Sequence, residues 1–263
     1  MSQPKIRVSI KQIYAAVALL ITAVAGLFGI GGAELDNLLS TFAGDQGALT
    51  TQTQAPSSST LADVPAYSGS PYVYINTEGG NTEGTPTFTD SEIEQAKSGA
   101  FENYSPLDSL GRCGTALACL GPETLPTGER GSIQNVHPTG WRQNFYDFVE
   151  QEALYNRCHL IAWSLSGEDA NAQNLITGTR SMNTEGMLPF EMMVLDYIRE
   201  TGNHVLYRAT PIFSGMNMLA DGVHLEAYSI EDNGYLQFNI YAYNVEPGVA
   251  IDYATGNNQE ASQ

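Results

Sequence analysis

The chain has 263 residues, of which 11 are basic and 29 acidic, so its formal net charge at pH 7 is −18. Proteins that bind nucleic acid usually carry an excess of Lys and Arg, because neutralisation of phosphate groups supplies most of their nonspecific affinity. Taken alone, the charge therefore argues against a nucleic-acid partner, and it excludes binding through a broad basic surface.

The N-terminal part of the chain has the pattern of a membrane segment. Basic residues precede an uncharged run over residues 12–33, whose length is near the roughly 20 residues needed to cross a bilayer. The run is longer than the roughly 7 to 15 apolar residues of a signal-peptide core. We therefore expect residues 1–33 to be a hydrophobic helix that serves as a signal anchor, with its basic flank in the cytoplasm. Ala23-Val24-Ala25 resembles a cleavage site, so a removed signal peptide is the alternative, and in both cases the remainder is extracytoplasmic, either membrane-anchored or secreted.

The composition changes after this segment. Residues 34–63 are rich in Ser, Thr, Gln, Gly and Ala, which bury too little apolar surface to offset the entropy of ordering, so we expect a flexible, disordered linker. Residues 64–263 are long enough for one compact domain with its own core. Three basic residues and no acidic residue precede residue 12, so the exported part holds 8 basic against 29 acidic residues, a net charge of −21.

The first elements of the domain are marked by local patterns. Residues 71–76 and 154–163 have the apolar and aromatic character of strands. Thr89 and Glu92 form a capping-box signature, which predicts the start of a short helix.

The second half of the domain has the clearest periodicity. Residues 188–201 are predicted to be a helix, because a proline lies in its first turn and a glycine just past its end. Three segments with a period of two then follow, at residues 204–213, 222–230 and 235–243. Asn233-Gly234 between the last two is a hairpin signal. We therefore expect an α+β domain with an antiparallel sheet core.

One strand carries residues that do not suit a buried position. Residues 155–163 read Tyr-Asn-Arg-Cys-His-Leu-Ile-Ala-Trp, and Arg157 and His159 interrupt the apolar pattern on the same face of the predicted strand. A histidine held in this way is a candidate general base. Amides at Asn174 and Asn183 follow, and the next helix carries Glu191. Strand, amide-rich loop and helix together form a candidate nuclease site.

The few basic residues of the domain are concentrated around this site in the sequence, at Arg112, Arg130, Arg142, Arg157 and Arg180. The rigid donor fork of Arg suits phosphate better than the point charge of Lys. The alternative for each of these residues is a salt bridge with one of the many carboxylates.

Several motifs, in this order, resemble the DNA/RNA non-specific endonuclease family: Leu110–Gly114, Arg130–Ile133, Pro138–Trp141, Asn156–Ile161, Asn174–Arg180 and Ile251–Gly256. The resemblance covers roughly residues 67–256 and is greatest to secreted and membrane-anchored bacterial members, including the DNA-entry nucleases. It implies a ββα-metal active site and cleavage of DNA and RNA with little sequence preference. The implied cofactor is Mg²⁺, for which Mn²⁺ can substitute.

The resemblance also implies roles for individual residues. His159 matches the base that activates water, and Arg157 would contact a phosphate beside it. Asn183 matches the residue whose amide oxygen binds the metal, which retains several water ligands. Many family members have Asp-Arg-Gly-His where this chain has Asn156-Arg157-Cys158-His159, so an ion pair of the family is in doubt here.

The remaining residues implied by the resemblance support this centre. Asn174 and Glu191 match positions near the metal, where they would orient its ligands and waters, and Glu191 is also the second candidate for the metal ligand. Arg130 and Arg180 would hold substrate phosphates.

Three cysteines, Cys113, Cys119 and Cys158, allow one disulfide in an exported protein. Cys113 and Cys158 belong to the family-like motifs, whereas Cys119 falls in an expected loop, so we expect a Cys113–Cys158 disulfide, with Cys113–Cys119 as the alternative. A nucleophilic Cys158 with His159 as its base is disfavoured, because adjacent residues of a strand point to opposite faces.

Two functions are compatible with these patterns. The first is an extracytoplasmic, metal-dependent endonuclease that acts on DNA and RNA and contacts the membrane through its N-terminal segment. The alternative is a catalytically silent, surface-anchored binding protein on the same fold, which only the acidity favours.

Overall fold

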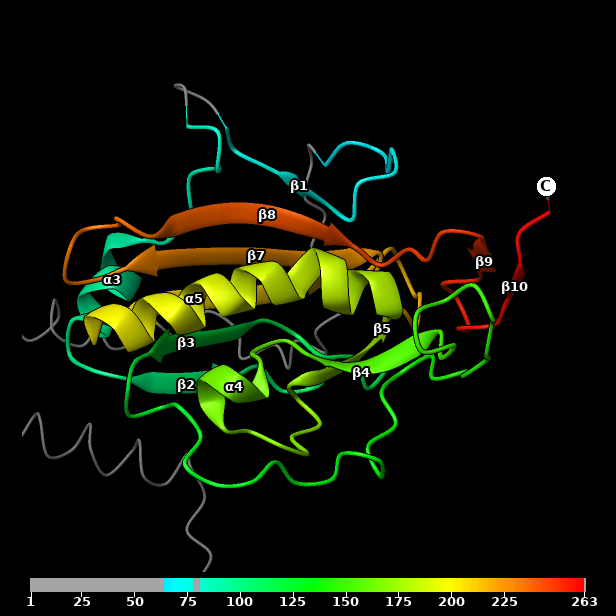
Figure 1. The fold of residues 1–263 in the computed structure, drawn as a ribbon, viewed down its shortest axis with the longest axis horizontal. Helices are drawn as coiled ribbons and strands as arrows, with labels where there is room; N and C mark the ends of the chain where they lie inside the picture. The colour runs from blue at the N-terminus through cyan, green and yellow to red at the C-terminus, as the bar shows by residue number, and fades with distance from the viewer. Residues whose placement is uncertain (1–63, 78–80, 263) are drawn as a thin grey trace, which may run out of the picture. The chain divides into compact units, whose positions relative to one another are not determined.

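The computed structural model describes residues 64–77 and 81–262 (Figure 1). The expected membrane segment, residues 1–33, and the expected linker, residues 34–63, lie outside the described residues. Within the described part of the chain, no helix is long and apolar enough to cross a membrane.

A six-stranded sheet forms the centre of the domain, with the strand order β1-β8-β7-β6-β3-β2. Every pair of neighbouring strands is antiparallel, which confirms the predicted α+β fold with an antiparallel core. The strands are β1 (Tyr72–Tyr74), β2 (Phe101–Tyr104), β3 (Ala116–Leu120), β6 (Val205–Ile212), β7 (Gly222–Ser229) and β8 (Gln237–Tyr243).

The predicted hairpin joins β7 to β8. Asn233 and Gly234 both have positive φ angles, 57° and 86°, which is why this pair of residue types favours such a turn. Residues 230–236 connect the two strands, so the loop is longer than the dipeptide alone.

Helix α5 (Leu188–Thr201) lies across one face of the sheet (Figure 1) and coincides with the predicted helix. Gly202 ends it in the left-handed conformation, with φ of 72°. Phe190 packs edge-on against Tyr72 of β1 at 4.8 Å between ring centroids, and at a tilt against Phe238 of β8 at 5.0 Å. Burial of one such ring contributes roughly 1.5–3 kcal/mol, so this contact fixes the start of α5 on the sheet.

Helix α3 (Asp90–Ala96) covers part of the opposite face. The predicted capping box is present: the Thr89 hydroxyl accepts a hydrogen bond from the Glu92 amide, and the Glu92 carboxylate accepts one from the Thr89 amide. Ala96 packs with Cys119 and Leu206 on this face.

A second, two-stranded sheet carries the motif residues. Strand β4 (Tyr155–His159) pairs antiparallel with β5 (Leu175–Thr179). The chain then forms a π-helical turn, η2 (Met182–Met187), which runs directly into α5. The order β4, β5, α5 is the expected strand–strand–helix unit. Two further short strands, β9 (Val249–Ile251) and β10 (Asn258–Glu260), pair near the C-terminus.

The expected strand over residues 154–163 is shorter than predicted. Strand β4 ends at His159, and a one-turn helix, α4 (Trp163–Ser166), follows. The Leu160 amide donates to the main-chain oxygen of Asn174 and the Asn174 side chain bonds the backbone of Ile161, so both residues are tied to the segment before β5.

The expected Cys113–Cys158 disulfide is not formed, since all three cysteines are free and buried. The Cys113 thiol is 3.2 Å from the main-chain oxygen of Leu175, at the start of β5. The Cys158 thiol instead packs against Gly178. Gly178 lies three residues after Leu175 in β5, which corresponds to roughly 10 Å along the strand. Cys119 lies in the buried strand β3, contrary to the loop that we expected. It packs with Ala96 and Leu206, whereas Cys113 belongs to the main core cluster, and the alternative Cys113–Cys119 disulfide is not formed either.

Candidate active site

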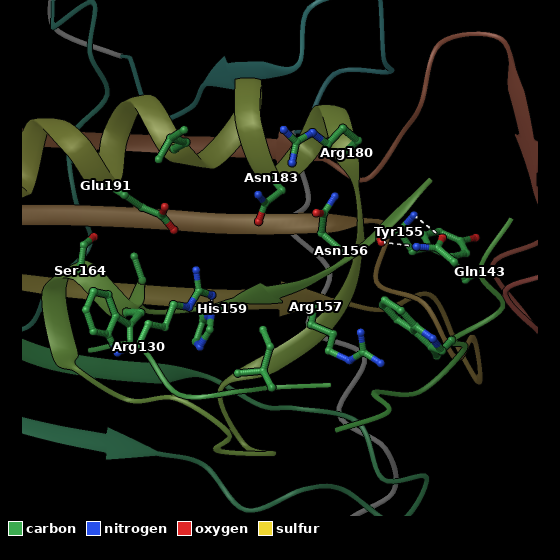
Figure 2. A pocket seen from close by; sticks show the side chains of 15 residues that line it. Arg130, Gln143, Tyr155, Asn156, Arg157, His159, Ser164, Arg180, Asn183 and Glu191 are labelled. Atoms are coloured by element: carbon green, nitrogen blue, oxygen red, sulfur yellow. Dashed lines mark hydrogen bonds between the residues drawn. The ribbon is translucent and has the colours of Figure 1, made fainter. Parts of the chain in front are cut away.

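A polar cleft of about 460 Å³ lies between β4 and the start of α5 (Figure 2). Six of the seven polar and charged residues predicted for the site line it. They are Arg130, Arg157, His159, Arg180, Asn183 and Glu191.

Main-chain bonding fixes the ring of His159 at the end of β4. Its Nε2 lies 2.9 Å from the main-chain oxygen of Asp169, and a carbonyl oxygen only accepts hydrogen bonds, so Nε2 carries the proton. The neutral ring therefore has its lone pair on Nδ1, which lies 3.4 Å from Nη2 of Arg130. His159 thus presents Nδ1 as the basic atom.

The surroundings of His159 lower its pKa. Burial is the largest cause, because it disfavours the charged imidazolium, and the positive charge of Arg130 acts in the same direction. The hydrogen bond to Asp169 opposes both. His159 is therefore neutral at pH 7 and able to accept a proton.

Asp169 organises the neighbouring loop as well. Its carboxylate oxygen Oδ1 accepts a hydrogen bond from the Gly131 amide at 2.8 Å. A Cβ on Gly131 would lie only 2.7 Å from the other carboxylate oxygen, so glycine allows this close approach. Asp169 thereby ties Arg130, the preceding residue, to His159. No sequence pattern marks Asp169, because its bond to His159 uses the backbone oxygen.

Arg157 lines the cleft but is engaged by main-chain groups. Nε donates to the Val136 oxygen at 2.5 Å and Nη2 to the Gln134 oxygen at 2.9 Å. The guanidinium group stacks over Trp141 at 4.2 Å from the ring centroid. Figure 2 shows the side chain directed away from His159. The structure thus places Arg157 as the anchor of the loop before Trp141, and not directly beside the base.

Asn183 and Glu191 face the cleft from η2 and α5 (Figure 2). In a regular α-helix, side chains eight residues apart diverge by about 80°. In the π turn the Leu188 amide is bonded to the main-chain oxygen of Asn183, five residues earlier, so each turn contains more residues than in an α-helix. The side chains of Asn183 and Glu191 are therefore closer to one face. Burial raises the pKa of Glu191 to about 8, and the charge of Arg130 opposes this shift.

The donors of the cleft suit a hard cation that keeps most of its water. Among the described residues there is no cluster of three His, Cys, Asp or Glu side chains that could enclose a metal ion. The amide of Asn183 offers an oxygen ligand of the kind that Mg²⁺ prefers, and Glu191, which is protonated at pH 7 without a cation, offers a second when a bound cation displaces its proton. Asn156, which also lines the cleft, has a buried amide nitrogen without a hydrogen-bond partner in the protein, as expected where a ligand or water completes a site.

Arg180 follows β5 at the opposite end of the cleft from His159 (Figure 2). Its Nε donates to Oε2 of Glu150 at 3.1 Å. Its amide is bonded to the main-chain oxygen of Leu154, which fixes the backbone.

Asn174 does not line the cleft, contrary to the expectation that it orients the metal's ligands. Its side chain is fully buried. Oδ1 accepts from the Ile161 amide at 2.8 Å, and Nδ2 donates to the Ile161 oxygen at 3.0 Å. Asn174 therefore clamps the chain just beyond His159.

Five arginines were noted near the predicted site in the sequence, and two of them, Arg112 and Arg142, also lie outside the cleft. Arg112 is buried, bonded to Asp108 at 2.8 Å and to the main-chain oxygens of Gly215 and Asn217. Arg142 is exposed and does not line the cleft. The basic footprint thus consists of Arg130, Arg157 and Arg180.

Comparisons with known proteins agree with this geometry. The family model of the DNA/RNA non-specific endonucleases matches residues 91–231, which include every cleft residue named above. No curated protein matches the chain.

Solved structures are also similar. NucA from Streptococcus agalactiae, solved with a magnesium ion bound, is 27% identical over 62% of this chain and 79% of that chain, with a TM-score of 0.56. Sda1 nuclease, solved with a bound zinc ion, is 26% identical over 65% of this chain and 87% of that chain, with a TM-score of 0.54. An extracellular endonuclease at 17% identity covers 74% of this chain and 100% of its own, with a TM-score of 0.50, and shares the fold.

Proposed function

Because the chain belongs to the DNA/RNA non-specific endonuclease family, we propose that it is a divalent-metal-dependent hydrolase that cleaves phosphodiester bonds of DNA and RNA with little sequence preference. The observation that carries this proposal is one polar cleft in which a neutral histidine faces Asn183 and Glu191 (Figure 2).

His159 is the general base. Water bound in the cleft transfers a proton to Nδ1 as it attacks phosphorus, because Nε2 is already protonated and bonded to Asp169. The Asp169 oxygen remains a hydrogen-bond acceptor for the imidazolium that forms. The lowered pKa keeps the base unprotonated at neutral pH.

Asn183 would hold the metal through its amide oxygen, with Glu191 orienting the metal's waters. When bound, Mg²⁺ supplies positive charge for the developing phosphorane and the departing oxygen. The magnesium in NucA and the zinc in Sda1 support a divalent ion at this centre. The small number of protein ligands favours Mg²⁺, with Mn²⁺ as a substitute, over a caged ion.

Arginine side chains hold the substrate. Arg130, beside Nδ1 of His159, is placed to donate to a phosphate oxygen at the reacting centre. Arg180 donates to a phosphate at the other end of the cleft. Arg157 contributes mainly by fixing the loop before Trp141.

We further propose that the enzyme acts outside the cytoplasm. The uncharged run over residues 12–33 supports export, either with the run as a membrane anchor or with its removal as a signal peptide. The extracellular endonuclease with the same fold is compatible with this location.

Cleavage of supercoiled plasmid by the purified full-length protein, with magnesium and with magnesium plus chelator, tests the proposal. We expect nicked and linear products only without chelator, and no products from the His159→Ala variant. Absence of cleavage with either magnesium or manganese would instead support the silent binding protein that the acidity favours.

A further inference from the structure

The guanidinium group of Arg180 is already paired with a carboxylate. Its Nε lies 3.1 Å from Oε2 of Glu150, which comes from the loop between Trp141 and β4. The two partners differ in exposure, since the Arg180 side chain is 15% exposed and that of Glu150 is 67% exposed. Within the described residues, Arg180 is the one cleft arginine that forms an ion pair with a carboxylate.

The backbone beside Glu150 is held in a specific conformation. Gln151 and Glu152 follow with φ angles of 59° and 63°, in the left-handed region that residues other than glycine rarely adopt. Hydrogen bonds close this turn: the Glu152 amide donates to the Val149 oxygen, and the Ala153 amide donates to the Gln151 oxygen. Val149 is buried. The turn therefore fixes the backbone beside Arg180 while leaving the carboxylate in solvent.

We propose that Glu150 occupies the position on Arg180 that a substrate phosphate takes, and that it thereby sets the affinity of the cleft for nucleic acid. The inference rests on the proposed function of the cleft. Carboxylate and phosphate both bind the guanidinium fork through charge-assisted hydrogen bonds, so a phosphate that binds through Nε of Arg180 must displace Glu150 from that nitrogen. An exposed carboxylate leaves readily because such ion pairs are weak, which makes the exchange possible.

Displacement of Glu150 from Arg180 lowers the net free energy gained when nucleic acid binds. Removal of the Glu150 charge frees Arg180 and also removes a negative charge next to the incoming phosphate. We therefore expect a gain in affinity of about 2- to 5-fold, the range of one exposed ion pair. In the wild type, salt weakens the exposed Glu150–Arg180 pair and so offsets part of the loss of affinity for DNA. The variant lacks this offset, so its slope of log affinity against log salt concentration should be steeper.

Glu150→Gln and Glu152→Gln form a matched pair of variants. Each removes one negative charge from the same exposed turn, but only Glu150 contacts Arg180. KM and kcat are measured for the full-length proteins on a fluorescent duplex with magnesium. Affinity and its salt slope are measured in the inactive His159→Ala background. We expect Glu150→Gln to lower KM about 2- to 5-fold and to steepen the salt slope relative to Glu152→Gln, with kcat changed by less than about 2-fold.

The Arg180→Gln background provides the decisive control. If Glu150 acts by competing for Arg180, adding Glu150→Gln to Arg180→Gln changes KM no more than adding Glu152→Gln to Arg180→Gln does, because only the general effect of one lost negative charge remains. Equal KM values and salt slopes for the Glu150 and Glu152 variants overturn the inference, and so does a raised KM, because Glu150 would then be orienting Arg180 for the substrate. These results concern Glu150 alone, whereas a wild-type protein without magnesium-dependent cleavage overturns the proposed function itself.

Discussion

The imidazole Nε2 of His159 donates a hydrogen bond to the main-chain oxygen of Asp169 at 2.9 Å, and this single contact determines which ring nitrogen acts as the base. Because Nδ1 of His159 is the proposed proton acceptor, His159→Ala should lower kcat by about 100-fold or more while the domain stays folded. Plasmid cleavage and circular dichroism test both parts. Added imidazole should restore part of the rate. A folded variant that cleaves like the wild type would remove His159 from the mechanism.

The pH dependence of kcat/KM should reflect the lowered pKa of His159. A general base works when it is neutral, so activity is lost as the pH falls through the pKa of the free enzyme. Since burial holds this pKa below its usual value of 6.5, the acidic limb should lie below pH 6.5. Arg130→Gln should move the limb upward, because the Arg130 charge contributes to the lowering. Rates measured at saturating magnesium from pH 4.5 to 9 test this, and an acidic limb above pH 6.5 would contradict it.

The elements that sequence predicts well are those with a local cause. Helix α5 coincides with the predicted range because its proline, its apolar period and its terminal glycine all lie within the helix or next to it. Strand β8 falls within the predicted period-two segment, residues 235–243, although both of its faces are buried. Strand β3 was missed because its residues are buried on both faces, and such a strand shows no alternation of polar and apolar side chains.

The sequence predicts the candidate site only in part, for a similar reason. A motif identifies residue types at fixed spacing, so His159, Asn183 and Glu191 were correctly brought into one cleft. A motif cannot distinguish an asparagine that acts at a metal site from one that bonds the backbone. Asn174 was predicted to act near the metal, but its side chain bonds the amide and oxygen of Ile161. The pairing of Glu150 with Arg180 joins residues 30 positions apart, and no local pattern marks it.

Asn183→Ala should impair catalysis through the metal. Loss of the amide oxygen removes the proposed direct protein ligand, so the magnesium concentration for half-maximal activity should rise and kcat should fall together. Asn183→Asp should recover part of the affinity, because a carboxylate is also a hard oxygen ligand. Asn103→Ala, an exposed asparagine of β2 outside the cleft, serves as the control in the same magnesium titration. An unchanged midpoint and rate for Asn183→Ala would move the ligand to Glu191.

Asn174→Ala should act on stability. The substitution leaves the buried amide and oxygen of Ile161 without partners, and each such group costs about 1–3 kcal/mol, so the free energy of unfolding should fall by about 2–6 kcal/mol. Urea unfolding in the presence of chelator measures this without a contribution from metal. Asn183→Ala should change the same quantity by less than about 1 kcal/mol. An Asn174 variant of wild-type stability but altered magnesium midpoint would return Asn174 to the metal centre.

The salt dependence of cleavage should be shallow. Residues 12–263 have a net charge of −21, and among the described residues only Arg130, Arg157 and Arg180 bring positive charge to the cleft. Few phosphates are therefore neutralised on binding, so few counterions are released, and the slope of log(kcat/KM) against log salt concentration should not exceed about 3 in magnitude. At low salt, long-range repulsion between the acidic domain and DNA slows their encounter, and added salt screens it. The two effects oppose each other, so we expect a broad optimum when rates are measured from low to moderately high sodium chloride at fixed magnesium. A steep decline that begins at the lowest salt would mean that many more phosphates are contacted than this cleft provides for.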